Sequence, residues 1–360
     1  MSKKVLIIAN NSDGLYRFRN ELIKELSKDK EIVISTPFDK FVSELRDLGC
    51  KLVETPIDRR SINPIKDFRL LSRLIRLIRR ENPDLIITYT IKPNIYGSIA
   101  ALLAKKRYAV NITGLGTAFE NPGLVRTIVV NLYRFALKRA SVVFFENSAD
   151  RETFLLYKCC RRDVTHVLNG AGVNTQKFGY IPYPNNVIFK FLFVGRVMKE
   201  KGIEELFNAM RRLYSEVPCC LDVVGPFEEN YEELLKECEN EGWLVYHGFQ
   251  NDVRPFIGAC DCFVLPSYHE GMANTNLESA SMGRPIITTS IPGCKEAVIN
   301  SKSGYLCEPR NPESLYLCMK KIMGQSRNER IAMGLLGRSH MESVFDKHIV
   351  VNETINCLYK

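Results

Sequence analysis

The sequence has no long uninterrupted apolar run. Its first apolar stretch, residues 5–9, is too short for a signal peptide and lacks a small-residue cleavage site, so we expect no export. Elsewhere no run approaches the roughly 20 apolar residues that a membrane-spanning helix needs. We therefore expect a cytoplasmic protein that does not cross the bilayer.

The sequence also lacks a recognisable metal or disulfide pattern. Its twelve cysteines are scattered, include vicinal pairs at 159–160 and 219–220, and contain no Cys-x-x-Cys. No two aspartates lie two positions apart, and no cluster of His and Cys has the spacing of metal ligands. The pattern favours a reduced protein over a disulfide or zinc protein, and it predicts no metal and no other cofactor.

Positive charge is concentrated in the first half of the chain. Residues 1–180 carry 31 Lys and Arg against 18 Asp and Glu, a balance of +13, whereas residues 181–360 carry 19 against 23, a balance of −4. A basic half suits anionic lipid, a polyanionic acceptor or nucleic acid. Aromatic residues are not interleaved with the basic ones as single-strand binding favours, so we expect no nucleic-acid partner.

Short β-rich runs alternate with helix-period segments along the whole chain, which is typical of parallel sheets covered by helices on both faces. A chain of 360 residues exceeds the usual size of one core, and the irregular stretch 174–186 reads as a linker. We predict an α/β protein of two doubly wound, Rossmann-like lobes enclosing a cleft. The lobes are 1–180 and 181–345, and a C-terminal helix, 346–360, crosses back to the first lobe. The expected strands are 5–9, 31–36, 51–55, 85–90, 108–112, 142–145, 164–168, 189–194, 221–224, 244–247, 262–265 and 285–288.

Ligands of such sheets bind at the strand-to-helix turns, where backbone amides and helix N-termini point outward. The turn after residues 189–194 contains Gly195, Arg196 and Lys201, shortly before a helix that starts near residue 203. Two cations near a helix N-terminus suit a pyrophosphate. The alternative is a pair of ordinary surface cations in a loop.

The turn after residues 262–265 is the most informative. Glu270 lies in the turn, Gly271 permits a close backbone approach, and Glu278 lies further along the following helix. One carboxylate is placed to hold a sugar hydroxyl and the other a ribose diol, with helix-start amides on a phosphate between them. The residues that offer these amides are Met272, Ala273, Asn274 and Thr275.

Turns of the first lobe carry weaker candidates. Gly14 lies at a helix start that favours an anion, although a plain tight turn explains it equally well. Lys92 and Asn94 follow the fourth strand and either meet an acceptor's diphosphate or form a capping turn. Gly114 and Gly116 lack the third glycine of a dinucleotide fingerprint, so they do not predict a dehydrogenase.

The spacing of Glu270 and Glu278, preceded by Gly195-Arg196 and Lys201, resembles family 4 of the GT-B glycosyltransferases. The likeness extends over essentially the whole chain. The segments that resemble the branch building capsule, O-antigen and protein-glycan precursors are 90–97, 113–116, 168–173 and 283–296.

The resemblance implies retaining transfer of a hexose or N-acetylhexosamine from a nucleotide sugar, UDP being favoured, to a sugar on undecaprenyl diphosphate. It implies that Arg196 and Lys201 bind the donor diphosphate and stabilise the leaving nucleotide. Glu278 is expected to hold the ribose, and Glu270 to touch the transferred sugar near the reacting carbon. The amides of residues 272–275 would complete the phosphate site, and Gly14 would let the first lobe close on the donor or acceptor.

One departure from the family concerns the first lobe. Many members carry a histidine near the anomeric carbon there, but the five histidines of this chain, at 166, 247, 269, 340 and 348, fall at or beyond the end of that lobe. Thr113 occupies the corresponding turn and His269 is interpreted as a structural neighbour of Glu270. No general base is assigned, which fits a retaining mechanism in which the departing phosphate takes the acceptor proton.

Two basic amphipathic helices are expected in the first lobe. Arg69, Arg73, Arg76 and Arg80 form one stripe of the first, and residues 124–139 have a similar character. They are either core helices with solvated basic faces or helices that lie on the cytoplasmic membrane surface near a lipid-linked acceptor. The second interpretation makes the protein a peripheral membrane protein.

Other classes of function fit less well. An epimerase needs a dinucleotide fingerprint and a Tyr-x-x-x-Lys pair, and Tyr16 and Tyr89 are not followed by such a lysine. A non-catalytic two-lobe sugar- or nucleotide-binding protein would not need the glutamate pair. A glycosyltransferase with a soluble acceptor stays open, and nothing in the sequence indicates an oligomeric state.

Overall fold

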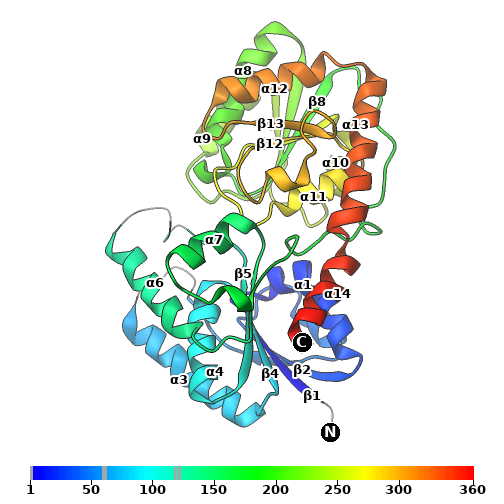
Figure 1. The fold of residues 1–360 in the computed structure, drawn as a ribbon. Coiled ribbons are helices and arrows are strands. Elements are labelled where there is room, and N and C mark those ends of the chain that lie inside the picture. Colours follow the sequence, from blue (N-terminus) through cyan, green and yellow to red (C-terminus); the bar gives the residue numbers. More distant parts are fainter. Residues whose placement is uncertain (1–2, 59–62, 117–118, 120–122) are drawn as a thin grey trace. The chain divides into compact units, whose positions relative to one another are not determined.

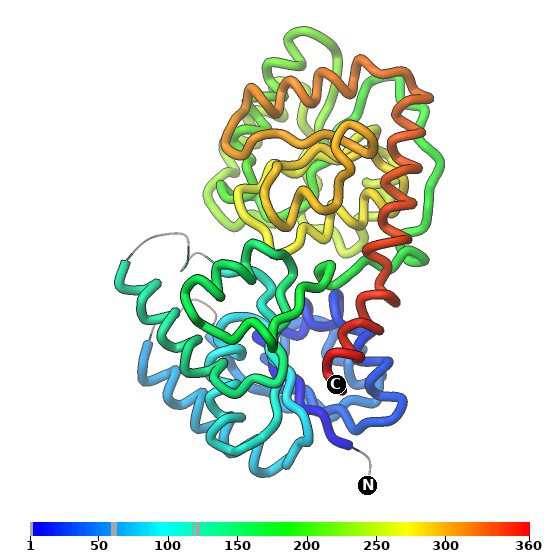
Figure 2. Tube along the Cα trace, in the orientation of Figure 1, coloured from blue at the N-terminus to red at the C-terminus, as the bar shows by residue number. Residues whose placement is uncertain are grey.

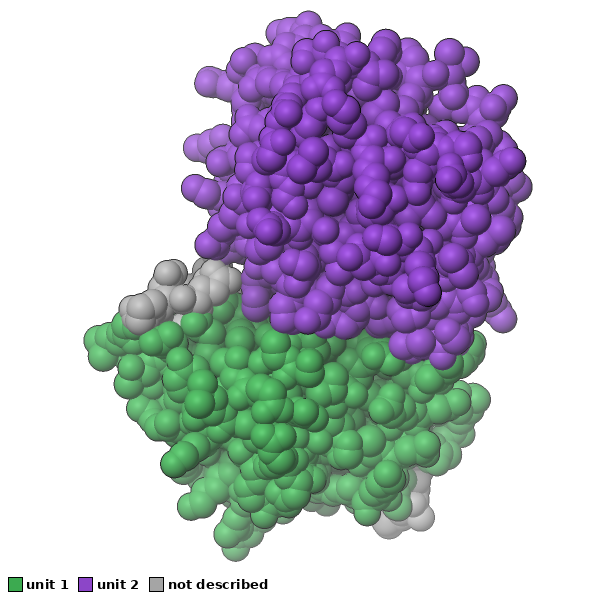
Figure 3. Space-filling model, turned by 45° about the horizontal axis from the view of Figure 1, so that its top comes forward, with its two compact units in different colours: residues 1–171, 348–360 green, residues 172–347 purple. Residues whose placement is uncertain are grey.

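The computed structural model describes residues 3–58, 63–116, 119 and 123–360. The chain forms two compact units, distinguished by colour in Figure 3. The first contains Met1–Ala171 and His348–Lys360, and the second contains Gly172–Lys347. The first unit thus ends at Ala171 rather than at the predicted residue 180, and the final helix belongs to the first unit.

The linker after Ala171 belongs to the second unit because buried arginines hold it there. The Arg284 guanidinium donates to the carbonyls of Ile181 and Pro182, each at 3.1 Å. Arg338 donates to the Phe178 carbonyl at 2.9 Å. Burial lowers the pKa of Arg284. Carbonyl oxygens therefore satisfy this cation where no carboxylate neutralises it, and they fix the linker against its own unit.

The first unit contains a parallel sheet of strand order β3-β2-β1-β4-β5-β6-β7 (Figure 1). Alternate residues of β1 point to opposite faces, so Leu6 and Ile8 join one core while Val5 and Ile7 join the other. The strands are β1 (Lys3–Ile8), β2 (Lys30–Thr36), β3 (Lys51–Glu54), β4 (Leu85–Tyr89), β5 (Arg107–Ile112), β6 (Val142–Phe145) and β7 (Thr165–Val167).

Helices cover both faces of this sheet. α3 (Pro64–Glu81), α4 (Ser98–Leu103) and α6 (Leu124–Ala136) bury residues in the same core, and they lie in one layer in Figure 1. On the other face lie α1 (Ser12–Ser27) and α14 (Lys347–Tyr359), so the end of the chain returns to its beginning, red beside blue in Figure 2. The other elements are α2 (Val42–Asp47), the π-helix η1 (Pro93–Gly97), α7 (Ser148–Leu156) and the short helix η2 (Arg162–Val164).

The second unit repeats the architecture around a parallel sheet of order β10-β9-β8-β11-β12-β13. Its strands are β8 (Phe189–Val194), β9 (Cys219–Val224), β10 (Leu244–Tyr246), β11 (Cys262–Leu265), β12 (Ile286–Thr289) and β13 (Gly304–Cys307). Its helices are η3 (Lys199–Lys201), α8 (Ile203–Glu216), α9 (Glu232–Asn240), α10 (Arg254–Ala259), α11 (Asn274–Ser281), η4 (Lys295–Ala297), α12 (Pro312–Met323), α13 (Arg327–His340) and η5 (Met341–Phe345).

Each of the twelve predicted strands is present with bounds within two residues of the expectation. The predicted class, two doubly wound parallel α/β domains, is confirmed. The edge strand β13 was not predicted. It is only four residues long and begins with Gly304, and glycine in so short a run reads as a turn. Pairing with β12 makes this segment a strand, not its own propensity.

Candidate active site

The carboxyl edge of the second sheet brings together two loops that are distant in sequence. β8 and β11 are neighbours in this sheet, with β9 and β10 on one side and β12 and β13 on the other. The strand order therefore reverses between β8 and β11, and ligands of open α/β sheets bind at such a point. The loop after β8 carries Arg196 and Lys201, and the loop after β11 carries Glu270.

Lys201 and Glu270 form an ion pair across these two loops. Their side chains are only 16% and 14% exposed, and the Ser267 hydroxyl donates to the same carboxylate oxygen of Glu270 at 2.8 Å. Partial burial lowers the local dielectric, so the two charges interact more strongly than they would in water. The sequence assigned Lys201 and Glu270 to different parts of a donor, whereas the structure shows that they also contact one another.

Backbone contacts fix the same two loops. The Tyr268 amide donates to the Glu200 carbonyl at 2.9 Å. Gly202 has a φ of +70°, and a Cβ at this position would lie 2.1 Å from the Pro266 carbonyl oxygen. Only glycine combines this φ with so close an approach. The separation of Lys201 from Glu270 is therefore set by the main chain as well as by the ion pair.

The loop after β12 supports Glu270 from a third strand. Gly293 has a φ of +85°, and a Cβ here would lie 2.5 Å from the Glu270 carbonyl oxygen and 2.6 Å from that of Gly271. The Gly293 carbonyl accepts from the Ala273 amide at 2.7 Å. Ala273 was predicted to offer this amide to a phosphate, but in the structure the amide is used within the chain.

Helix α11 begins at Asn274, just after the Glu270 loop. No side chain caps its start, and first-turn amides of a helix have no intrahelical acceptor, so Asn274 and Thr275 are suited to an anion. Two polar atoms here, Asn274 Oδ1 and His269 Nε2, are buried and make no hydrogen bond within the described part of the chain. Buried polar atoms ordinarily have partners, and unpaired ones are typical of a ligand site.

The remaining donor candidates lie around this point. Gly271 and Met272 are buried in the loop, and Glu278 is half-buried in the second turn of α11. Arg196 comes directly after Gly195 at the end of β8, and its side chain is 47% exposed. Its guanidinium is 3.7 Å from the Glu228 carboxylate. A loose exposed pair contributes little, so the Arg196 charge remains available to an anion.

The candidates of the first unit also lie at the carboxyl edge of their sheet. The strand order reverses there between β1 and β4. Gly14 is in the first turn of the helix that follows β1, Lys92 follows β4, and the half-buried Thr113 comes directly after β5.

The start of α1, where Gly14 was predicted to face a donor or acceptor, is capped by side chains of the same unit. Asn11 Oδ1 accepts from the Gly14 amide at 2.5 Å. Asp39 Oδ1 accepts from the Ser12 and Asp13 amides, each at 3.0 Å. The Asp39 carboxylate thus occupies the place where the helix dipole favours an anion. The alternative interpretation, a tight turn, accounts for Gly14 in this structure.

Lys92 and Asn94 are both held by other residues of their unit. Lys92 Nζ lies 2.7 Å from Asp67 Oδ1, and the Tyr96 hydroxyl donates to Asp67 Oδ2 at 2.9 Å. Asn94 is 1% exposed and donates to the Asn111 carbonyl at 2.8 Å. Lys92 is therefore tethered to α3, and the Asn94 amide supports β5 instead of facing solvent.

Two family models match the chain, one in each unit. Residues 4–147 match the model described as "Glycosyl transferase 4-like", and residues 188–325 match that described as "Glycosyl transferases group 1". This chain belongs to the family 4 glycosyltransferases of the GT-B fold. The predicted family and enzyme class are thereby confirmed.

Curated relatives of this glycosyltransferase match over nearly its full length. It is 27% identical to an N,N'-diacetylbacillosaminyl-diphospho-undecaprenol alpha-1,3-N-acetylgalactosaminyltransferase of Campylobacter jejuni, over 96% of each chain. It is 22% identical to the capsular polysaccharide biosynthesis glycosyltransferase CapM of Staphylococcus aureus, over 97% of this chain and 94% of that one. It is 27% identical to a UDP-Gal:alpha-D-GlcNAc-diphosphoundecaprenol alpha-1,3-galactosyltransferase of Escherichia coli, over 82% and 83%.

Solved structures agree on the fold of this glycosyltransferase. A glycosyltransferase from Rickettsia africae superposes with a TM-score of 0.82 at 18% identity, covering 99% of this chain and 98% of that one. HepE from Anabaena, in complex with UDP and glucose, also gives a TM-score of 0.82, at 16% identity and 99% coverage of both chains.

Three residues that shape this glycosyltransferase were not predicted from the sequence. Ser267 orients Glu270, Gly293 supports the Glu270 loop, and Asp67 binds Lys92. Gly293 lies in a segment that carries the family resemblance, which is a usable signal. Asp67 is 25 residues from Lys92 in the sequence, and no local pattern connects the two.

The substitution Gly293→Ala should displace the Glu270 loop, because the new Cβ overlaps two carbonyl oxygens and because a left-handed φ costs an L-residue about 1–2 kcal/mol. We expect the initial rate of sugar transfer to fall about 10²-fold, since small misplacements of reacting groups have effects of this size. The matched control is Gly248→Ala, at φ +63° with nothing within 4 Å of the added Cβ. Equal losses in the two variants would show that backbone strain alone is responsible.

Proposed function

We propose that this glycosyltransferase moves a hexose or N-acetylhexosamine from a nucleotide sugar to a saccharide carried on a polyprenyl diphosphate, with retention of anomeric configuration. The observation that carries the proposal is the Lys201–Glu270 ion pair beside the uncapped start of α11. The printed names of two relatives, which act on diphospho-undecaprenol saccharides, support the acceptor class. The UDP-Gal donor of one relative and the UDP complex of HepE support UDP as the nucleotide.

The donor would bind with its diphosphate against the start of α11. Lys201 and Arg196 supply positive charge to the leaving nucleotide, and charge-assisted hydrogen bonds of this kind stabilise a transition state in which negative charge develops. Glu278 is placed one turn into α11 to hold the ribose hydroxyls. Glu270, oriented by Lys201 and Ser267, holds the transferred sugar.

The departing phosphate is the proposed proton acceptor. The bond between the anomeric carbon and the phosphate oxygen breaks, and the acceptor hydroxyl oxygen bonds to the same face of that carbon. The hydroxyl proton passes to the phosphate oxygen that has left. Thr113 cannot serve as a base in this step, because a neutral hydroxyl holds its proton at ordinary pH.

Glu270→Ala and Lys201→Ala test this site. With a donor found by screening nucleotide sugars for hydrolysis or thermal stabilisation, we expect Glu270→Ala to lower kcat about 10²-fold with little change in donor Kd, because the carboxylate acts on the reacting sugar. Lys201→Ala should lower kcat by a similar factor and also weaken donor binding, because it removes a cation from the diphosphate.

The matched control for these variants is Lys199→Ala. Lys199 lies in the same short helix as Lys201 and is exposed. A donor that is used equally well by wild type, Glu270→Ala and Lys201→Ala would refute the site. Rapid transfer to a soluble saccharide but none to a diphosphate-linked one would refute the acceptor class, and NMR of the product linkage tests retention.

We also propose that transfer needs no divalent metal, because Lys201 and Arg196 provide the positive charge that a metal would otherwise supply. In the described part of the chain, no three His, Cys, Asp or Glu side chains are grouped as metal ligands. Initial rates should therefore be the same after extensive dialysis against EDTA. Loss of turnover in EDTA, restored by Mg²⁺ or Mn²⁺, would contradict this.

We further propose that the first unit binds an anionic membrane surface on the cytoplasmic side. Among the described residues, no helix combines the length and the apolar character of a bilayer span. α6, however, exposes Leu124 and Ile128, at 76% and 47%, together with Arg134. α3, in the same layer, exposes Ile65 and Phe68. Exposed apolar side chains beside cations are typical of helices that lie in the membrane interface.

The double substitution Leu124→Ser with Ile128→Ser tests this attachment. Each apolar side chain contributes about 1.5–3 kcal/mol on burial, so co-sedimentation with phosphatidylglycerol vesicles should weaken at least about tenfold. Thr127→Ser, an exposed change on the same helix, is the control. Unchanged vesicle binding by the double variant would exclude α6 as the contact.

A further inference from the structure

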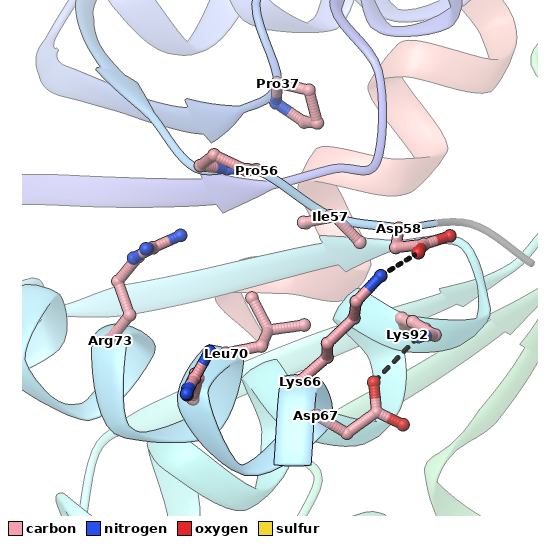
Figure 4. Close-up of a pocket in the computed structure, with 10 residues that line it drawn as sticks. Pro37, Pro56, Ile57, Asp58, Lys66, Asp67, Leu70, Arg73 and Lys92 are labelled. Carbon is pink, nitrogen blue, oxygen red and sulfur yellow. Dashed lines mark hydrogen bonds and ion pairs between the residues drawn. The ribbon is translucent and has the colours of Figure 1, made fainter. Parts of the chain in front are cut away.

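A groove runs along one flank of α3 in the first unit. A cavity of about 470 Å³ lies between the first half of α3 and the segments that follow β2 and β3 (Figure 4). A second cavity, of about 480 Å³, lies beside β3 and shares Arg73 with the first. We call the two cavities together the α3 groove.

The α3 groove is lined by the basic stripe that the sequence indicated. Arg69 and Arg73 are one helical turn apart and line the first cavity. Within the described chain, neither makes a hydrogen bond or an ion pair, so both guanidinium groups are available. The cations of the stripe along the whole groove are Lys66, Arg69, Arg73, Arg76 and Arg80.

The carboxylates of the first cavity are already paired with lysines. Lys66 lies 3.0 Å from Asp58 and Lys92 lies 2.7 Å from Asp67, as the dashed lines in Figure 4 mark. These pairs leave the charges of the two arginines unbalanced. Negative charge from a ligand would therefore be attracted to Arg69 and Arg73 rather than to the lysines.

The other walls of the first cavity are apolar and offer few hydrogen-bond donors. Pro37 and Pro56 have no amide hydrogen, and Ile57 and Leu70 are hydrocarbon. An anion here must be recognised by the arginine side chains, while the apolar walls suit an organic group attached to it. The chemistry fits a phosphate ester better than a free inorganic ion.

We propose that the α3 groove binds the diphosphate of the lipid-linked acceptor, with Arg69 and Arg73 contacting its phosphate oxygens. This inference rests on the proposed function. Guanidinium groups bind phosphate oxygens in a bidentate manner, and two of them with Cβ atoms about 5–6 Å apart match two adjacent phosphates better than a single phosphodiester. Pro37, Pro56 and Lys92 follow β2, β3 and β4, so the groove lies at the ligand-binding edge of the sheet.

Binding of inorganic pyrophosphate is the direct test. Calorimetry is done on the full chain with saturating UDP, which occupies the donor phosphate site of the second unit. The wild type should bind pyrophosphate, and Arg69→Gln with Arg73→Gln should weaken the Kd about 10²-fold, about tenfold for each charged contact. Arg79→Gln, on α3 but outside both cavities, is the control and should bind like the wild type. Equal affinity in the double variant would overturn the proposal.

Transfer kinetics distinguish the sources of the phosphate. The kcat/KM for a saccharide on prenyl diphosphate, divided by that for the same saccharide as an alkyl glycoside, should fall at least about tenfold in the double variant and stay constant in Arg79→Gln. An unchanged ratio would overturn the proposal. So would competition for pyrophosphate binding by phosphatidylglycerol but not by a prenyl diphosphate, which would assign the groove to membrane lipid.

The two proposals fail separately. If the wild type transfers no sugar to any diphosphate-linked saccharide, the proposed function is refuted, whatever the arginine variants show. If transfer to that acceptor is intact but independent of Arg69 and Arg73, the groove assignment alone is refuted.

Discussion

The parallel pairing of β8 with β11 is the constraint on which the donor site depends. Phe191 and Leu192 of β8 lie opposite Cys262 and Phe263 of β11. Because the two strands are parallel, both end at the same edge of the sheet and their loops leave it side by side. Lys201 and Glu270 are 69 residues apart in the chain, and this pairing brings their side chains into contact.

The ion pair has a consequence for the chemistry of transfer. A lysine or a carboxylate that is partly buried without a partner is costly, and each charge here compensates the other. A phosphate that binds Lys201 must therefore share or replace its contact with Glu270. The two residues act as a unit, because a donor that engages the lysine changes the surroundings of the carboxylate beside the reacting sugar.

The first unit shows how internal carboxylates decide which cations remain available to a ligand. Asp39 caps the start of α1, and Asp67 holds Lys92. Neither place presents an unbalanced charge to an incoming anion. The flank of α3 that carries Arg69 and Arg73 differs, since no carboxylate of the described chain reaches these two arginines. The excess positive charge of this half of the sequence therefore acts at α3.

The sequence by itself determined the alternation of strands and helices, the doubly wound class and the loops that carry Gly195, Arg196, Lys201 and Glu270, because hydrophobic periodicity and glycine positions are local properties. It could not determine which charges meet. The contacts of Lys201 with Glu270 and of Lys92 with Asp67, and the fit of Gly293 under the Glu270 loop, join distant segments. Only the order of strands in each sheet sets such distances, and strand order is a property of the folded chain.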